Sequence, residues 1–224
     1  LWHVWWKFLP ISILKYLNDG PIEHQNGQHQ CLSLPTCMAN KKNLYYRTGN
    51  KGNVDFTDRW DDLKPLIDFN PNHIVLDVGC AEGLIAIELA KQFKQVYAFD
   101  VEPYRIKRAI KNANGIANIY FKTNNYMIYK YNTYDQIFCL GVYHKIKRKW
   151  RRPVIRRQEI LDTMFKRCKS TLYLRVPIVS NNVLKTVGVS DVEVLKIADN
   201  NNFNLVYRSE PRYNHGTLFK FQKR

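Results

Sequence analysis

The chain has 224 residues, of which 45% are hydrophobic and 13% aromatic, and it carries a formal net charge of +16. This length accommodates one domain with a full hydrophobic core and a short extension, and this composition excludes a disordered chain. A surface with a pI near 9.7 attracts polyanions such as nucleic acid, anionic lipid headgroups or phosphorylated substrates. The alternative is that the charge serves only solubility.

The first residues form an aromatic segment that we separate from the rest of the chain. Residues 1–17, LWHVWWKFLPISILKYL, are too short and too polar to span a bilayer, and they lack the features of a signal peptide. Such a segment either packs on its own domain, which we favour, or lies on a membrane surface. Residues 18–53 are rich in Asn, Gln and Gly and are interpreted as a loop. We therefore divide the chain into residues 1–56, the aromatic segment and loop, and residues 57–224, a folded domain.

The five cysteines do not indicate a disulfide framework. Cys80, Cys139 and Cys168 lie in apolar runs, a usage typical of a reduced, cytoplasmic protein. The remaining two belong to a polar stretch with four candidate metal ligands, His24, His29, Cys31 and Cys37. Their spacing matches none of the common structural zinc patterns, so we expect a polar loop there and no metal site.

From residue 56 onward, helical and strand patterns follow in turn. Residues 56–69 have helical spacing, with Thr57 or Asp58 as candidate N-cap. Strands are then predicted at residues 73–79, 95–100, 118–123, 134–142, 170–177, 203–209 and 216–222. Helices are predicted at residues 83–93, 103–114, 153–169 and 190–201.

This alternation predicts a doubly wound α/β domain with a mostly parallel sheet and helices on both faces. The last two strands have only a short link between them, which favours an antiparallel pair at one edge. In such a fold the ligand site lies outside the carboxyl ends of the strands.

A glycine-containing junction lies at the end of the first long strand, in HIVLDVGCAEGLIAIELA. Gly79 and Gly83 allow a tight turn and a close approach to a ligand, and Asp77 precedes that turn. Asp100 ends the next strand, where a carboxylate can accept hydrogen bonds from both hydroxyls of a ribose. The pair therefore indicates a nucleoside site.

The spacing within the junction favours one kind of nucleoside cofactor. A dinucleotide site needs G-x-G-x-x-G, whereas here Ala81 stands where a middle glycine would be and Glu82 follows it. A carboxylate at Glu82 would repel a pyrophosphate but suits a cofactor that carries an ammonium and a sulfonium. We therefore expect S-adenosylmethionine. The alternatives are the ordinary turn residues of any doubly wound fold, and a nicotinamide dehydrogenase.

The motifs VLDVGCAEG, AFDVEP and YDQIFCLGVYHK resemble those of the class I S-adenosylmethionine-dependent methyltransferases, over roughly residues 57–222. The resemblance implies a seven-stranded sheet whose last strand is antiparallel. It also implies that the glycine loop wraps the methionine part of the cofactor, Asp77 lies beneath the amino group and Asp100 holds the ribose. The cofactor-binding residues implied in full are Asp77, Gly79, Cys80, Ala81, Gly83, Asp100, Val101, Asn125, Leu140 and Gly141. Asn125 replaces the acidic residue that usually bonds the adenine amino group, and an amide oxygen can still accept that bond.

Two residues that follow the fourth strand are candidates for the chemistry. His144 would lie near the methyl group and can serve as general base, or it is a hydrogen-bonded structural residue. Tyr143 can line the acceptor pocket. No Asn/Asp-Pro-Pro-Tyr motif and no suitably placed cysteine is present, which disfavours methylation of DNA bases.

A basic segment comes next, with eight Lys or Arg among residues 145–157 and Trp150 in the middle. Cations around an aromatic ring can hold phosphates and stack a base, so RNA is a candidate acceptor. The candidate substrate-binding residues are Lys147, Arg148, Lys149, Trp150, Arg151 and Arg152. The stretch also loosely resembles methyltransferases that complete wobble-uridine modifications of transfer RNA. A solvated surface without a partner is the alternative.

Three functions remain open from the sequence. The first is a methyltransferase that acts on an O or N atom of RNA, and the second is one that acts on a small or lipid-linked metabolite. The third is a protein that binds the cofactor without catalysis. The acceptor and the oligomeric state are not determined by the sequence.

Overall fold

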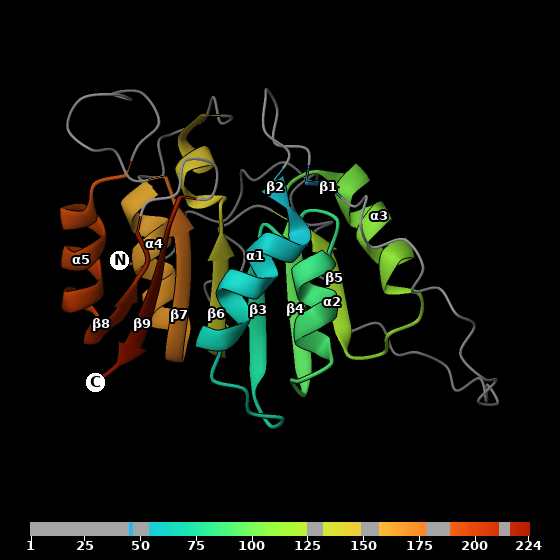
Figure 1. Cartoon of the computed structure of the whole chain (residues 1–224), viewed down its shortest axis with the longest axis horizontal. Helices are drawn as coiled ribbons and strands as arrows, with labels where there is room; N and C mark the ends of the chain where they lie inside the picture. The colour runs from blue at the N-terminus through green and yellow to red at the C-terminus, as the bar shows by residue number, and fades with distance from the viewer. Residues whose placement is uncertain (1–44, 47–53, 125–131, 149–156, 178–188, 211–215) are drawn as a thin grey trace, which may run out of the picture. The chain divides into compact units, whose positions relative to one another are not determined.

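A computed structural model of the chain describes residues 45–46, 54–124, 132–148, 157–177, 189–210 and 216–224 (Figure 1). The predicted division at residues 56 and 57 stays a prediction, because most of the first segment lies outside these ranges.

A short antiparallel pair, β1 (Tyr45–Tyr46) and β2 (Val54–Asp55), precedes helix α1 (Phe56–Leu63) and the 3-10 turn η3 (Lys64–Leu66). The prediction of a loop over residues 18–53 was therefore wrong at β1, because two residues are too few to show an alternating pattern. The N-cap prediction was also wrong, since α1 begins at Phe56 and places Thr57 and Asp58 in its first turn.

The main sheet has seven strands in the order β5-β4-β3-β6-β7-β9-β8. The strands are β3 (Ile74–Val78), β4 (Gln95–Asp100), β5 (Ile119–Thr123), β6 (Tyr134–Leu140), β7 (Cys168–Val176), β8 (Phe203–Arg208) and β9 (Thr217–Lys223). The last strand, β9, runs antiparallel to both β7 and β8, and the other pairings are parallel. This confirms the predicted doubly wound sheet with an antiparallel last strand.

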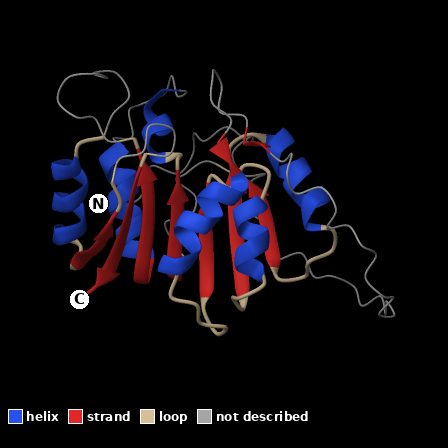
Figure 2. Cartoon of the chain, in the orientation of Figure 1, coloured by secondary structure: helices blue, strands red, loops and turns tan. Residues whose placement is uncertain are grey.

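Helices alternate with the parallel strands, as Figure 2 shows. They are α2 (Leu84–Ala90), α3 (Pro103–Ala113), α4 (Arg157–Arg167) and α5 (Asp191–Asn200), with a second 3-10 helix, η4 (Tyr143–Arg148), directly after β6. Pro103 opens α3, at the predicted first residue, and Ser190 takes the N-cap position of α5. Cys168 was placed on a helix face by the sequence but begins β7.

Two apolar layers hold the helices to the sheet. On one face α1, α2 and α3 cover side chains such as Val75, Val96 and Phe138. On the other face α4 and α5 pack on side chains such as Leu76 and Ile137. Because both faces are buried, the strands show continuous apolar runs instead of alternation.

The segment after α1 is anchored to the middle of the sheet. The Tyr173 ring stacks on Phe138 with centroids 4.7 Å apart, and its hydroxyl donates to the carbonyl of Leu66 while it accepts from the N–H of Asp68. Gln136 also donates to the Asp68 carbonyl, at 2.6 Å. These bonds fix the C-terminal side of α1, and thereby the helix, against the sheet.

No helix within the described residues has the length and hydropathy that crossing a bilayer requires. Among the described residues, Cys80, Cys139 and Cys168 are free thiols and are buried. The metal-ligand stretch, residues 24–37, lies outside the described ranges, and the described part of the chain holds no cluster of three or more potential ligands.

Candidate active site

The glycine loop joins β3 to α2 through three residues with positive φ. Gly79 has φ 72°, Ala81 φ 50° and Gly83 φ 80°. The N–H of Cys80 donates to the Phe99 carbonyl at 2.8 Å, so the loop is fixed to the end of β4. Ala81 occupies a conformation in which a Cβ is unfavourable, and this agrees with its place at the position of a middle glycine.

Both glycines are also required by the packing of the chain on itself. A Cβ at Gly79 would lie 2.7 Å from the Val142 side chain. A Cβ at Gly83 would lie 2.9 Å from both Ala109 and Phe121. The sequence suggested a tight turn and the close approach of a ligand, whereas these contacts also let Val142, α3 and β5 pack close to the turn.

Asp100 connects the loop to the start of the next crossover. One carboxylate oxygen accepts the N–H of Ala81 at 3.0 Å, and the other accepts the N–H of Glu102 at 2.9 Å. A carboxylate has about four lone-pair sites, so these two bonds leave acceptor capacity for the hydroxyls of a ribose. Asp100 therefore shapes the loop and keeps acceptor capacity for a ligand, and the first role was not predicted.

Asp77 is the most perturbed acid of the site. Its side chain is buried, and its Oδ2 atom has no hydrogen-bond partner among the described residues. Burial, and secondarily the neighbouring Asp100, raises the pKa of Asp77 from 3.8 to about 7. A buried acceptor without a donor is costly, so a cationic donor at this position would be stabilising.

Glu82 plays a different part from the one that the sequence suggested. Its carboxylate accepts from Arg108 on α3 at 2.8 Å, and its carbonyl accepts from Asn112. The carboxylate is therefore paired with a cation of the protein itself. This pairing weakens the predicted role of Glu82 in selecting the cofactor. The expectation of S-adenosylmethionine therefore depends on Asp77 and Asp100.

The remaining residues predicted to bind the cofactor are Cys80 in the glycine loop and a group at the carboxyl ends of β4 and β6. Cys80 is buried, and burial raises the pKa of its thiol, which makes it a packing residue and not a nucleophile. Val101 directly follows β4, Leu140 ends β6, and Gly141 comes directly after it. Among the described residues, a Cβ added at Gly141 would meet only Nη1 of Arg59, at 3.7 Å. Asn125 lies outside the described residues.

His144 is a neutral imidazole in η4. Burial lowers its pKa from 6.5 to about 4, helped by the positive charges of Lys145, Arg157 and Arg59. Its Nδ1 atom is buried without a hydrogen-bond partner among the described residues. A ring that stays unprotonated at neutral pH keeps a lone pair available for a proton.

Tyr143 is engaged with α5 and Arg157. Its side chain is fully buried, and its hydroxyl donates to Glu193 of α5 at 3.0 Å. Arg157 also pairs with Glu193, at 3.1 Å, and its guanidinium lies over the Tyr143 ring. Of the two residues predicted to take part in the chemistry, the Tyr143 hydroxyl is hydrogen-bonded to Glu193, whereas Nδ1 of His144 has no hydrogen-bond partner among the described residues.

The structure describes little of the basic segment. Lys147 and Arg148 end η4, but only their backbone is described. Lys149, Trp150, Arg151 and Arg152 lie outside the described residues. The predicted contact of this segment with an acceptor stays a prediction.

Two arginines near Gly141 were missed by the sequence analysis. Arg59 approaches it from α1, and Arg175 at the end of β7 accepts the Gly141 N–H with its carbonyl at 2.9 Å. Arg175 had a signal, since it interrupts the apolar strand run LYLRV. Arg59 had none, because a charged residue on a short amphipathic helix is ordinary.

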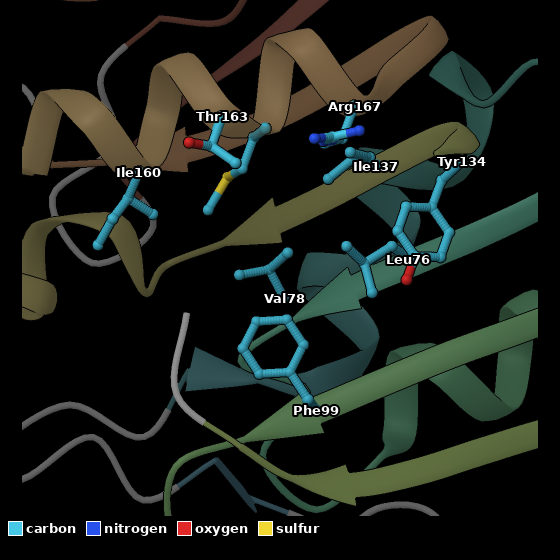
Figure 3. Close-up of a pocket in the computed structure, with 9 residues that line it drawn as sticks. Leu76, Val78, Phe99, Tyr134, Ile137, Ile160, Thr163 and Arg167 are labelled. Carbon is cyan, nitrogen blue, oxygen red and sulfur yellow. The ribbon is translucent and has the colours of Figure 1, made fainter. Parts of the chain in front are cut away.

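A small cavity beneath α4 is separate from these groups (Figure 3). It has a volume of about 20 Å³, enough for about one water molecule. Its lining is Leu76, Val78, Phe99, Tyr134, Ile137, Ile160, Thr163, Met164 and Arg167. The cavity lies between helix and sheet and is too small for a nucleoside.

The strand order, the antiparallel last strand and the acidic residues at the ends of β3 and β4 define the class I S-adenosylmethionine-dependent methyltransferase fold. Residues 75–161 match the family described as methyltransferase domain, a stretch that runs from β3 into α4. Together these findings confirm the resemblance to this class that the motifs indicated. A search of curated proteins gives no match.

Solved structures with this fold include enzymes with different acceptors. Magnesium protoporphyrin IX methyltransferase from Synechocystis PCC 6803, crystallised with S-adenosylmethionine, is 17% identical with a TM-score of 0.59, over 78% of this chain and 87% of that one. N-methyltransferase NodS from Bradyrhizobium japonicum WM9 is 18% identical with a TM-score of 0.61, over 75% and 95%. An O-methyltransferase family 2 protein from Planctomyces limnophilus, in complex with apigenin, is 15% identical with a TM-score of 0.56, over 74% and 56%. None of these supports the looser likeness to transfer RNA wobble-uridine methyltransferases, which stays a prediction.

Proposed function

We propose that the protein is an intracellular enzyme that binds S-adenosylmethionine and transfers its methyl group to an O or N atom of an acceptor. The observation that carries this proposal is the arrangement of Asp77 and Asp100 at the ends of adjacent strands. Asp77 is a buried carboxyl group whose Oδ2 has no hydrogen-bond partner among the described residues. Asp100 accepts two backbone hydrogen bonds and can accept more.

The residues present fit this cofactor. The ammonium of its methionine part would supply the donor that Asp77 Oδ2 lacks, and its charge would stabilise the ionised carboxylate. Asp100 would accept from the ribose hydroxyls. The loop residues Gly79, Cys80, Ala81 and Gly83 would surround the methionine part, Val101 and Asn125 the adenine, and Leu140 and Gly141 the sulfonium.

When bound, the cofactor supplies an activated methyl group, and the remaining task of the chain is alignment of the acceptor. Alignment of the reacting atoms alone contributes several kcal/mol to such a transfer, on the order of 7–11 kcal/mol at most. His144 can take the proton that an O–H or N–H nucleophile loses, because its ring is neutral at physiological pH. Lys145, Arg157 and Arg59, whose charges lower its pKa, disfavour the imidazolium that results, so the proton would pass on to solvent.

The acceptor is the open part of this proposal. The three solved structures named above are a magnesium protoporphyrin IX methyltransferase, an N-methyltransferase and an O-methyltransferase in complex with apigenin, so one fold serves several acceptors. The charge of +16 and the basic residues 145–157 support a phosphate-rich acceptor such as RNA. A small or lipid-linked metabolite is the second candidate, with the aromatic residues 1–17 in contact with a membrane surface, and a protein that binds the cofactor without catalysis is the third.

Incubation with a cofactor labelled in its methyl group tests the proposal. The full-length protein is mixed with cell extract fractionated into RNA, lipid, protein and small molecules. Label in one fraction supports methyltransferase activity, and the labelled fraction identifies the class of acceptor. Asp100→Asn, which keeps the size of the side chain, is expected to abolish labelling. Label in no fraction, with cofactor binding intact, would favour the non-catalytic alternative.

A further inference from the structure

The 3-10 helix η4 is held by a carboxylate of α5. The Tyr143 hydroxyl donates to Oε1 of Glu193 at 3.0 Å, and Nη2 of Arg157 lies 3.1 Å from Oε2 of the same side chain. The Arg157 guanidinium lies over the Tyr143 ring, 5.3 Å from its centroid. Each of these three residues therefore contacts the other two, although they come from η4, α4 and α5.

These contacts are shielded from solvent. Tyr143 is fully buried, and the side chains of Arg157 and Glu193 are 15% and 18% exposed. Burial, and secondarily the charge of Glu193, raises the pKa of Tyr143, so its hydroxyl stays protonated and can donate. A desolvated ion pair contributes little net stability, because the cost of removing both charges from water offsets their attraction. Its charge-assisted hydrogen bonds do fix a geometry.

The start of η4 is also fixed on the side of the glycine loop. The N–H of Lys145 donates to the Val142 carbonyl at 2.8 Å, which closes the first 3-10 turn. The Val142 side chain lies against Gly79, where an added Cβ would be 2.7 Å from it. Because a 3-10 helix has about three residues per turn, the side chains of Val142, Tyr143 and His144 point in three different directions. The glycine loop and α5 hold the first two, and the imidazole takes the third.

We propose that Glu193 is a positioning residue for methyl transfer, which fixes η4 through Tyr143 and thereby orients the His144 ring beyond the end of β6. A general base acts only if its nitrogen lies within hydrogen-bond reach of the proton that it takes. Nδ1 of His144 has no hydrogen-bond partner among the described residues, so the placement of the ring depends on the backbone of η4. The inference rests on the proposed function, because it assigns Glu193 a role in the transfer through His144.

Removal of the Tyr143 hydroxyl alone tests this inference. The full chain is saturated with S-adenosylhomocysteine, and the ring of His144 is followed by NMR against pH in the parent and in Tyr143→Phe. This substitution leaves the charges that act on the ring, those of Lys145, Arg157 and Arg59, unchanged. We expect the pKa of His144 to rise from about 4 toward 6.5, because a ring that is no longer held gains contact with water.

Tyr97→Phe is the matched control. Tyr97 lies on β4, and its hydroxyl accepts from Gln95 at 2.8 Å, so this variant also loses one hydrogen bond of a tyrosine. It should leave the pKa of His144 as in the parent. Urea unfolding of both variants measures their stability, and a change at His144 in Tyr143→Phe alone separates positioning from general stabilisation.

The rate of methyl transfer is the second readout, measured with the labelled cofactor and the cell fraction that accepts label. A general base contributes about 100- to 10,000-fold, so Tyr143→Phe and Glu193→Ala should each lower the rate at least about tenfold, with unchanged affinity for S-adenosylhomocysteine. Glu193→Gln should recover part of this rate, because an amide oxygen can still accept from Tyr143. In a His144→Gln background, Tyr143→Phe should cause no further loss, since its effect passes through that ring.

The outcomes separate this inference from the proposed function. An unchanged pKa of His144 in Tyr143→Phe, or an equal loss of rate with and without His144, overturns the inference, while labelling by the parent upholds the proposed function. If Tyr143→Phe does not fold, the comparison of Glu193→Gln with Glu193→Ala decides, and equal rates in these two variants overturn the inference. Absence of label from every fraction, or failure of the parent to bind S-adenosylhomocysteine, overturns both.

Discussion

Replacement of Asp77 by asparagine should stabilise the protein in the absence of cofactor. The pKa of this buried carboxyl is raised from 3.8 to about 7, so the folded state holds a proton that the unfolded state releases between those two pH values. Stability is therefore lost as pH rises from about 3.8 to about 7, and the loss is complete above pH 7. At 1.36 kcal/mol per pKa unit, the difference between 3.8 and about 7 corresponds to about 4 kcal/mol.

Asparagine avoids this cost because it has the same shape and no charge. Its amide would itself be buried with unmade hydrogen bonds, which costs about 1–3 kcal/mol, so we expect a net gain of about 1–3 kcal/mol at pH 7.5. Urea unfolding of the parent and Asp77→Asn without cofactor, between pH 4.5 and 8, measures it. The gain should shrink as pH falls, because the parent carboxyl then becomes protonated.

Asp162→Asn is the matched control. Asp162 is paired with Lys166 and Asn201, and the hydrogen bonds to these two residues lower its pKa. The same substitution there should destabilise the protein, by no more than about 1 kcal/mol because the pair is at the surface. If Asp77→Asn is less stable than the parent at pH 7.5, or if its gain is independent of pH, the reasoning about a desolvated carboxyl is refuted.

Three further predictions concern the loop and its neighbour. Ala81→Gly should raise the free energy of unfolding by about 0.5–1 kcal/mol, because φ at this residue is 50° and the relief of the strained Cβ exceeds the entropy that glycine adds to the unfolded chain. Urea unfolding measures this gain, and its absence would contradict the strain. Gly79→Ala should lower the stability of the protein by about 1–3 kcal/mol, because the added Cβ would lie 2.7 Å from Val142. In thermal unfolding, the double variant with Val142→Ala should recover part of this lost stability. The ring protons of His144, assigned by comparison with His144→Gln, should titrate in NMR spectra with a pKa of about 4, and a value near 6.5 would show that the ring is solvated.

Much of the fold could be predicted because the buried strands and amphipathic helices leave strong patterns. The predicted strand at residues 95–100 coincides with β4, and Pro103 marked the start of α3. The error at Cys168 has a simple cause. Apolar residues continue the helical spacing of Leu161 and Phe165 across the end of α4, and no glycine marks the stop.

The site was predicted where its chemistry is local in sequence and missed where it depends on contacts between distant elements. Asp77 and Asp100 follow from the motifs. The hydrogen bond from Ala81 to Asp100 and the pairing of Glu82 with Arg108 join residues 19 and 26 positions apart, and no periodicity encodes them. Arg59 reaches Gly141 from α1, and the segment after this helix is anchored on Tyr173, a long-range contact that the sequence pattern of α1 does not indicate.

The most direct measurement is calorimetric titration of the pure, full-length protein with S-adenosylhomocysteine, the demethylated form of the expected cofactor. The loop at Gly79 and the two carboxylates, Asp77 and Asp100, predict a saturable heat with one molecule bound per chain, strongly reduced in Asp100→Asn. Absence of saturable heat from a folded parent protein, or equal affinity in parent and variant, would contradict the assignment of this site to an adenosyl cofactor.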